Sequence, residues 1–386
     1  MTKHDDDLWE ALSRGGSRIS RRSMLKGTAL LGGAALLNAC SNSNSPGVTA
    51  GAGGSAPPIE PKVDGDLYYF NWAQYINPKI ISGFEDHYGV TVHKTYFENE
   101  DEVVAKVGAG QPYDVAVIGG YNLPKLIAAG KLREIDHSTL QNYSEVMSFF
   151  NNPPYDPGAK HSVPYDVGPE GIAYRTDMVQ NMTGSWNDLW THPEAKGHTY
   201  VLDSMEDTIG MSLLKSGFAL DASDPAQLDQ AGNALIDLKP NLGGFSSNDY
   251  NMVHDQAWLM QAWTGDIYYY LSVADNPDLV RWQACKEGTL FSADNMVIPV
   301  AAKHPGTALL LIDWVTHPEN AALNVDYIGY PVPTKAGMAE YNKLIKGYPW
   351  LAIGDDDLSD PSQWMTSLTG SQLALWTSTW TKVKAA

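Results

Sequence analysis

The stretch Asp66–Ile76, DLYYFNWAQYI, decides the fold of this chain. Leu67–Phe70 is a short apolar and aromatic run, and such a run predicts a buried strand. The residues Asn71–Tyr75 are expected to form a loop. A helix is expected to begin at Asn77-Pro78, because Asn is a favoured N-cap and Pro suits the first helical turn. The stretch therefore predicts a strand, a loop and a helix in an α/β fold.

The loop in this stretch carries two aromatic residues, Trp72 and Tyr75. In open α/β sheets ligands bind at the loops that follow the carboxyl ends of strands. Indole and phenol faces attract cations, so the pair suits a flat or cationic ligand. The alternative is that both rings pack under the next helix, because aromatic residues also dominate cores. Spacing alone leaves both interpretations open.

The following sequence repeats the alternation of strands and helices. Helical patterns at 80–87, 101–107 and 123–129 are separated by apolar strand patterns near 90–92 and at 113–118. This alternation is typical of a layered α/β fold. Extended stretches at 162–168 and 290–299 predict a crossing into a second lobe and a crossing back. A further extended crossing is expected at 327–333.

The first forty residues predict an export signal. Ser20–Lys26, SRRSMLK, resembles a twin-arginine signal, and a small apolar stretch follows at 27–37 that is too short to span a membrane. Leu37–Cys40, LNAC, resembles a bacterial lipobox. We therefore expect residues 1–39 to be a signal peptide and Cys40 to carry a lipid. Residues 40–61 form the anchor and a flexible tether rich in Gly, Ser, Pro and Ala.

Composition narrows the function. Residues 1–39 hold six Lys or Arg and four Asp or Glu, so their removal leaves 20 basic and 41 acidic residues. This acidic balance argues against a nucleic-acid partner and is compatible with a cationic ligand. With Cys40 lipidated, Cys285 has no partner, so neither a disulfide nor a cysteine-based metal site is expected. About 325 residues remain after the tether, which suggests two lobes.

Acidic and aromatic residues recur near the predicted strand ends. Each acid alone could be a solvated turn residue or a helix N-terminal residue. Together they would suit an organic ammonium, because rings offer cation–π attraction and carboxylates accept charge-assisted hydrogen bonds. The candidate ligand-binding residues are Trp72, Tyr75, Tyr121, Asp207, Trp263, Asp266, Asp294 and Tyr330.

The same regions carry a resemblance to a known family. The sequence from Leu67 to Lys382 resembles the bacterial periplasmic spermidine/putrescine-binding proteins of ABC importers. The stretches that carry it, in family order, are 69–75 (YFNWAQY), 113–115 (YDV), 162–165 (SVPY), 186–190 (WNDLW), 263–266 (WTGD), 293–294 (AD) and 328–331 (IGYP).

The resemblance implies a two-lobe α/β periplasmic-binding-protein fold of type II, with crossing segments between the lobes and the ligand in the cleft. Lobe 1 is expected to comprise 62–166 plus 295–330, and lobe 2 to comprise 167–294 plus 331–386. The lobes would close on the ligand by a hinge motion. No catalysis, cofactor or metal is implied. The expected partners are a small amine, an ABC permease with its ATPase, and a membrane through the lipid; a monomer is expected.

Carried over by position, the resemblance assigns roles to the candidates. Trp72, Tyr75 and Tyr121 would wall the cleft from the first lobe. Trp263 would stack on a methylene chain, and Tyr330 would line the last crossing. The three acids Asp207, Asp266 and Asp294 would meet amine groups, with Asp294 accepting a terminal ammonium.

The chain also departs from the family pattern. Ala73 occupies a position where the family has Thr or Ser, and Gln74 one where it has an acid. Ser204 replaces an Asp of the family pattern, Ser292 replaces a Trp and Met365 replaces a Gln. These positions are expected to shift specificity. The acids expected around the far end of the site are thus largely replaced by neutral residues. This leads to the hypothesis of a ligand with one firmly held ammonium and a differently bound far end, either a shorter diamine or a mono-cation with a neutral or anionic tail.

Three other functions remain open from the sequence. A receptor for a sugar or an amino-acid-like amine would use similar aromatic platforms. An exported hydrolase could use paired carboxylates such as Asp207 and Asp294. No nucleophile elbow, HExxH motif or Cys/His pair supports an enzyme. A lipoprotein that binds only other proteins is the third alternative, and it would show no stabilisation by amines.

Overall fold

The strand of the opening stretch, β1, spans Leu67–Trp72 and is two residues longer than predicted. The strand continues through Asn71 and Trp72 because they pair in parallel register with Tyr96 and Phe97. The buried Asn71 side chain also accepts from the Trp72 N–H and donates to the Tyr69 hydroxyl. Helix α2, Pro78–Tyr88, follows with Asn77 as its N-cap, and the Asn77 side chain accepts from the Lys79 N–H. The predicted strand, loop and helix are thus confirmed.

The computed structural model describes residues 58–97, 99–247 and 256–386. Its strands form one sheet in the order β2-β1-β3-β9-β4-β7-β5-β6, and β8 also pairs with β4. The pairs β1–β2, β1–β3, β5–β6 and β5–β7 are parallel, and β9 runs antiparallel to both β3 and β4. After β1, the strands are β2 (Val92–Phe97), β3 (Val115–Gly119), β4 (Ser162–Arg175), β5 (Thr199–Val201), β6 (Leu242–Phe245), β7 (Leu259–Trp263), β8 (Val280–Gln283) and β9 (Leu290–Val297).

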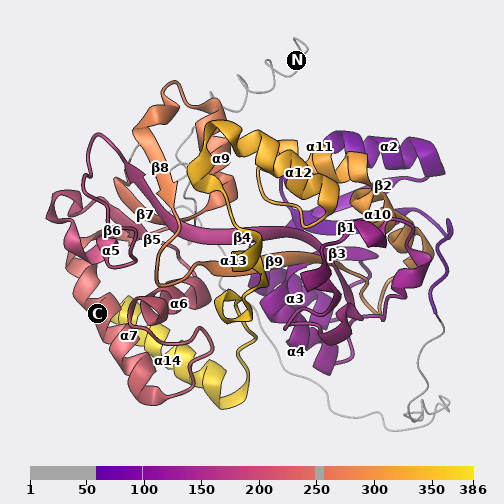
Figure 1. The fold of residues 1–386 in the computed structure, drawn as a ribbon. Helices are drawn as coiled ribbons and strands as arrows, with labels where there is room; N and C mark the ends of the chain where they lie inside the picture. Colours follow the sequence, from indigo (N-terminus) through magenta and orange to yellow (C-terminus); the bar gives the residue numbers. More distant parts are fainter. Residues whose placement is uncertain (1–57, 98, 248–255) are drawn as a thin grey trace, which may run out of the picture. The chain divides into compact units, whose positions relative to one another are not determined.

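Helices cover the sheet at both of its ends (Figure 1). Those near β1 to β3 are α2, α3 (Glu100–Gly108), α4 (Leu123–Ala128), α10 (Pro305–Thr316), α11 (Pro318–Ile328) and α12 (Lys335–Leu344). The others are α5 (Asp188–Thr191), α6 (Met205–Lys215), α7 (Pro225–Leu238), α9 (Thr264–Val273), α13 (Asp355–Ser359) and α14 (Gly370–Ala385). The predicted mixed α/β class is therefore correct.

Two strands join the halves of this fold. β4 is buried from Ser162 to Ala173, and β9 lies beside it over almost all of this length (Figure 1). β4 bulges between Pro164 and Asp166. These strands are the predicted crossings at 162–168 and 290–299, and both predictions are confirmed. Each is a continuous strand of the sheet, so the side chains that it carries between the two halves are regularly spaced along it.

The buried side chains form two clusters. The larger cluster includes Phe70, Ile118 and Leu309, and the smaller one is built mainly on α6, α7 and α14 with Trp186 and Trp376. The predicted crossing at 327–333 stays a prediction. This stretch joins α11 to α12, which pack together, and it also contacts α9, because Tyr330 donates to the Asp266 carboxylate. Further along, the N–H of residue 365 donates to the Phe291 carbonyl.

The bounds of the two lobes remain a proposal. Tyr341 of α12 and Leu351 belong to the larger cluster, and so do Ile267 of α9 and Trp282 of β8, which were also assigned to lobe 2 from the sequence. Cluster membership therefore gives no reason to move the proposed boundary after residue 330. Cys285 is a buried free thiol, and burial raises its pKa above the ordinary range.

The leader predictions lie outside the described residues. The signal peptide at 1–39, Cys40 and the tether up to residue 57 are not described. Within the described ranges, each helix is too short or too polar to cross a bilayer.

Candidate ligand-binding cleft

Two carboxyl groups face each other across the joining strands. Asp166 of β4 is paired in register with Asp294 of β9, and Asp294 is also paired with Gly119 of β3. Directly opposite residues of an antiparallel pair lie on one face with Cβ atoms about 5 Å apart, and like charges there repel. Burial and Asp294 raise the pKa of Asp166 well above its usual range. Burial raises the pKa of Asp294 to about 6, although Tyr75 and Trp72 oppose this by donating hydrogen bonds.

Aromatic rings enclose this pair of acids. Trp72 ends β1 and packs on Phe97, with ring centroids 4.4 Å apart. Tyr75 lies in the loop after β1, and its ring meets Tyr330 edge to face at 5.9 Å. Burial and the charges of Asp166 and Asp294 raise the Tyr75 pKa. Both interpretations of Trp72 and Tyr75 thus hold in part, because each ring packs on neighbours and faces the acids.

A third carboxyl group joins the first pair from α3. Glu100, the first residue of α3, accepts from the Asn122 side chain at 2.9 Å and from the Gly119 N–H at 3.3 Å. Burial and Asp294 raise its pKa to about 8. Tyr121 lies beside it, and burial together with the charges of Glu100 and Asp207 raises the Tyr121 pKa. Tyr121 therefore faces acids from both halves of the fold.

A second group of acids lies further along β4. Glu170 is fully buried and accepts from the Gln261 side chain at 2.8 Å, and Gln261 also donates to the Asp207 carbonyl at 3.1 Å. Burial and the adjacent Asp207 carboxyl raise the Glu170 pKa, while the Trp263 side chain lowers it by donating a hydrogen bond. The Ser204 hydroxyl caps α6 and bonds the Asp207 carboxylate.

The remaining predicted residues lie between these groups. Tyr330 donates to the Asp266 carboxylate at 3.0 Å, so Asp266 is held by a cleft ring. Ser292 is paired with Gly168 across β4 and β9, beside Trp263 and Tyr330. Ala73 and Gln74 are exposed in the loop after β1, and Gln74 adopts a positive φ of 56°.

The structure thus places the eight predicted residues around β4 and β9, beside one of the two acid groups or between them. Their role in ligand binding stays a prediction. The structure adds three acids that the sequence did not single out: Glu100, Asp166 and Glu170. The sequence held a signal for each of them. Asp166 and Glu170 are acids inside the extended stretch 162–171, and Glu100 is an acid at the start of a helix. We interpreted the stretch only as a crossing. Glu170 adds one buried acid beside Asp207, and the hypothesis about the far end of the site stays a prediction.

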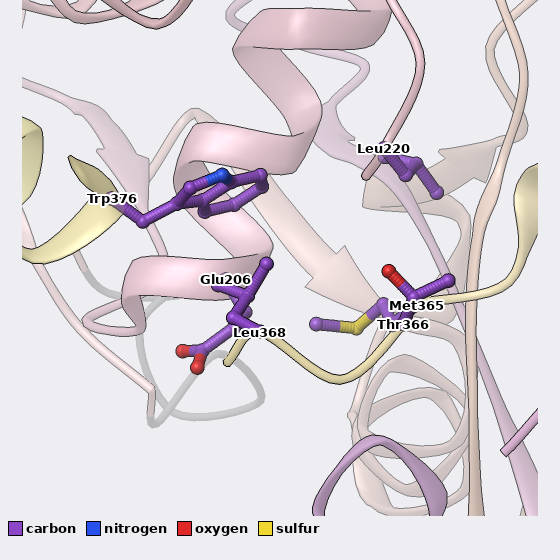
Figure 2. A pocket seen from close by; sticks show the side chains of 6 residues that line it. All are labelled: Glu206, Leu220, Met365, Thr366, Leu368 and Trp376. Atoms are coloured by element: carbon purple, nitrogen blue, oxygen red, sulfur yellow. The ribbon is translucent and has the colours of Figure 1, made fainter. Parts of the chain in front are cut away.

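Two cavities lie beside this cleft and not within its acid groups. A cavity of about 10 Å³ is lined by Glu206, Leu220, Met365, Thr366, Leu368 and Trp376. Figure 2 shows the Met365 side chain extending toward Glu206 and Leu368. A larger one, about 320 Å³, is lined by Pro124, Pro154, Tyr155, Met365, Thr366, Ser367 and Thr369. Met365 therefore borders a neighbouring cavity, and it does not touch the paired acids in any contact described above.

The cleft acids have no countercharge in the described part of the chain. The ion pairs found there involve other carboxylates, and Lys125 acts only weakly, on Glu206. In the same ranges, His, Cys, Asp and Glu are nowhere grouped as metal ligands. Buried charges are normally paired, and burial raises the pKa of these carboxyl groups, so a cationic organic ligand would stabilise their charged forms.

The fold and this cleft define a two-lobed solute receptor. A model described as "Bacterial extracellular solute-binding protein" matches residues 79–352, and the chain belongs to that family. The spermidine/putrescine-binding periplasmic protein of Escherichia coli K12 is 32% identical over 277 residues, covering 70% of this chain and 78% of that protein. The spermidine/putrescine-binding periplasmic protein 1 of Haemophilus influenzae is 28% identical over 359 residues, covering 92% of this chain and 96% of that protein. A solved structure from Listeria monocytogenes, named for a putative spermidine/putrescine ABC transporter, is 27% identical to this chain and superposes with a TM-score of 0.75. The match covers 83% of this chain and 99% of that one.

Proposed function

We propose that this protein captures an aliphatic polyamine or a related organic amine outside the cytoplasm and delivers it to an ABC importer. The observation that carries the proposal is the set of buried carboxyl groups without a countercharge. Asp166, Glu170 and Asp207 are at most 5% exposed, and Asp294 and Glu100 lie against them or their partners. A ligand bearing ammonium groups supplies the missing charge.

The rings support the same ligand class. Tyr75, Trp72 and Tyr330 surround one acid pair, and Trp263 contacts the other. Aromatic faces attract ammonium groups and also cover methylene chains, so they suit a molecule with both. A sugar would require donors and acceptors for several hydroxyl groups, whereas acidic side chains dominate this cleft.

Transport without chemistry is the mechanism we propose. The ligand enters while the lobes are apart, and contacts to acids of both lobes hold them together. The closed form then docks on a membrane permease. The names of the relatives support this proposal, since those proteins are described as binding spermidine and putrescine.

A thermal-shift titration tests the proposal. A ligand at about one hundred times its dissociation constant stabilises the folded state by about 2.7 kcal/mol. We expect spermidine and putrescine to raise the melting temperature, and sodium chloride at the same ionic strength to have no such effect. Equal shifts with salt, or none with either amine, would refute polyamine capture.

Export and anchoring form a second part of the proposal. The twin-arginine motif at Arg21-Arg22 and the lipobox at Cys40 support a folded export route and a lipid anchor. Stable anchoring needs more than one acyl chain, as a bacterial lipoprotein carries. We expect Cys40→Ser to move the protein from the membrane fraction to the soluble fraction. Recovery of the wild-type protein in the soluble fraction would contradict anchoring.

A further inference from the structure

The turn after β3, residues 119–122, carries Tyr121, and Glu100 of α3 binds the two ends of that turn. The Gly119 N–H lies 3.3 Å from each Glu100 carboxylate oxygen, and the Asn122 side chain donates to Oε2 at 2.9 Å. The Asn122 amide oxygen in turn accepts from the Lys125 ammonium at 3.4 Å. One carboxyl group therefore joins the first and the last residue of the turn.

Helix α3 gives Glu100 a fixed place. Glu100 is the first residue of α3, and the Asn99 side chain caps the helix by accepting from the Glu102 N–H at 2.9 Å. Val103 and Val107 bury the following turns of the helix in the larger cluster. α3 packs against β3, the strand that leads into the turn (Figure 1). The carboxyl group is thus held by a capped and packed helix.

The Tyr121 ring and the Glu100 carboxyl group meet at Gly119. A Cβ atom at Gly119 would lie 2.9 Å from Tyr121 Cε1 and 3.4 Å from the Glu100 carboxyl carbon. The next residue, Gly120, is packed just as closely, because its Cβ atom would lie 2.8 Å from the Tyr155 ring. The turn is therefore packed against Glu100 and Tyr155, and a change at Glu100 gives the Tyr121 ring room to move.

We propose that Glu100 is a positioning residue, which holds the turn 119–122 so that Tyr121 keeps its place between the two acid groups of the cleft. Tyr121 is the ring concerned because the charges of Glu100 and Asp207, one from each acid group, both act on its hydroxyl. Glu100 thus supports amine binding through Tyr121, in addition to any effect of its own charge. This inference rests on the proposed function and concerns the regulation of the same site.

The charge state of Glu100 sets how firmly it holds the turn. A charged carboxylate accepts from Gly119 and Asn122 together, whereas a protonated one turns an acceptor oxygen into a donor. Burial and repulsion by Asp294 of β9 and, less strongly, Asp101 of α3 raise the pKa of Glu100 to about 8, while its two donors oppose this rise. An ammonium ligand nearby favours the charged form. Amine binding therefore strengthens the hold on the turn.

A double-mutant cycle with Glu100→Gln and Tyr121→Ala tests this inference by calorimetry with spermidine. The Gln amide keeps one acceptor oxygen and replaces the other by a donor, so it cannot accept from Gly119 and Asn122 together. We expect Glu100→Gln to weaken spermidine binding about tenfold when Tyr121 is present, since hydrogen bonds to charged groups are the strong ones. In the Tyr121→Ala background the loss should be at most about threefold, because no ring remains to be positioned.

The matched control is Asp101→Asn. Asp101 is the exposed acid next to Glu100 on α3, so this change removes the same charge from the same helix turn. Because an exposed charge is screened by solvent, Asp101→Asn should weaken spermidine binding less than about threefold. An effect as large as that of Glu100→Gln would assign the loss to charge and contradict positioning.

Hydrogen exchange gives a second readout that does not depend on affinity. Without ligand, amides of residues 119–122 should exchange faster in Glu100→Gln than in the wild type, and at the wild-type rate in Asp101→Asn. Each variant is first checked for a cooperative thermal transition. If Glu100→Gln does not fold, Asn122→Ala, which removes the side-chain donor to Glu100, replaces it in both measurements with the same expected results.

Equal losses of spermidine affinity with and without the Tyr121 ring, or unchanged exchange at residues 119–122, would overturn this inference and leave the proposed function standing. A wild type that binds neither spermidine nor putrescine would instead overturn the proposed function.

Discussion

Replacing Asp294 by Asn should move ligand affinity and folding stability in opposite directions. Asp294 faces Asp166 across the strands, and Tyr75 and Trp72 donate toward it. The change keeps the size of the side chain and an oxygen acceptor for both donors, and it removes only the negative charge. A residue with a purely structural role would not give this pair of opposite effects.

The magnitudes follow from the pKa and from the lost ammonium contact. Burial raises the Asp294 pKa from 3.8 to about 6, and about two units correspond to up to about 3 kcal/mol. Because the folded-state pKa is the higher one, the folded protein binds the proton more tightly. The cost is therefore absent below pH 3.8, grows as the pH rises from 3.8 to 6, and is complete above pH 6. Loss of a charged hydrogen bond of about 1.5–3 kcal/mol weakens amine binding about 10- to 150-fold.

Urea unfolding of both proteins without ligand, at pH 4 and pH 8, measures the first effect. We expect Asp294→Asn to be more stable than the wild type by up to about 3 kcal/mol at pH 8, and nearly equal to it at pH 4. Calorimetry with spermidine at pH 8 measures the second effect. Lower stability of the variant at pH 8, or an unchanged affinity for spermidine, would refute the placement of Asp294 in a ligand-binding acid pair.

Two more predictions concern the same cleft. Burial raises the pKa of Glu100 to about 8 and that of Asp294 to about 6, so both carboxyl groups gain protons as the pH falls from 8 to 5. A protonated carboxyl group cannot neutralise an ammonium, so spermidine affinity should fall over this range. Calorimetry at pH 7 in two buffers of different ionisation enthalpy should show proton release when spermidine binds. A spermidine affinity that does not change between pH 8 and pH 5 would contradict this prediction. Trp263→Ala should weaken spermidine binding by about 0.5–2 kcal/mol. Trp190→Ala, which changes a Trp of the smaller cluster whose indole donates to the Ala234 carbonyl, is its control and should leave affinity unchanged, so equal losses in both would argue against stacking by Trp263.

Local sequence signals predicted the individual elements better than their packing. The Asn77-Pro78 start of α2 and the buried run of β1 follow from residue chemistry over a few positions. The segment 327–333 shows what local signals leave out. Pro331 and Pro333 indicate an extended segment, but its packing partners, α11 and Asp266 of α9, are set by the fold.

The site shows the same limit. Trp72 and Asp294 could be selected because aromatic residues and acids at strand ends suggest a ligand. Asp166 could not be selected in this way, because its importance depends on its pairing with Asp294, more than a hundred residues later. Glu170 likewise gains its meaning from Asp207 on α6 and Gln261 on β7. Strand register, which sequence reasoning did not provide, therefore determined how many acids meet in the cleft.

A competition experiment tests the central claim most directly. The purified protein is incubated with equal concentrations of spermidine, putrescine, butylamine, glucose and 4-aminobutyrate at pH 8, free solutes are removed, and the retained molecules are identified by mass spectrometry after denaturation. We predict that spermidine is retained in preference to the other four. Retention of glucose, 4-aminobutyrate or no molecule at all would contradict a cleft built for a polycation.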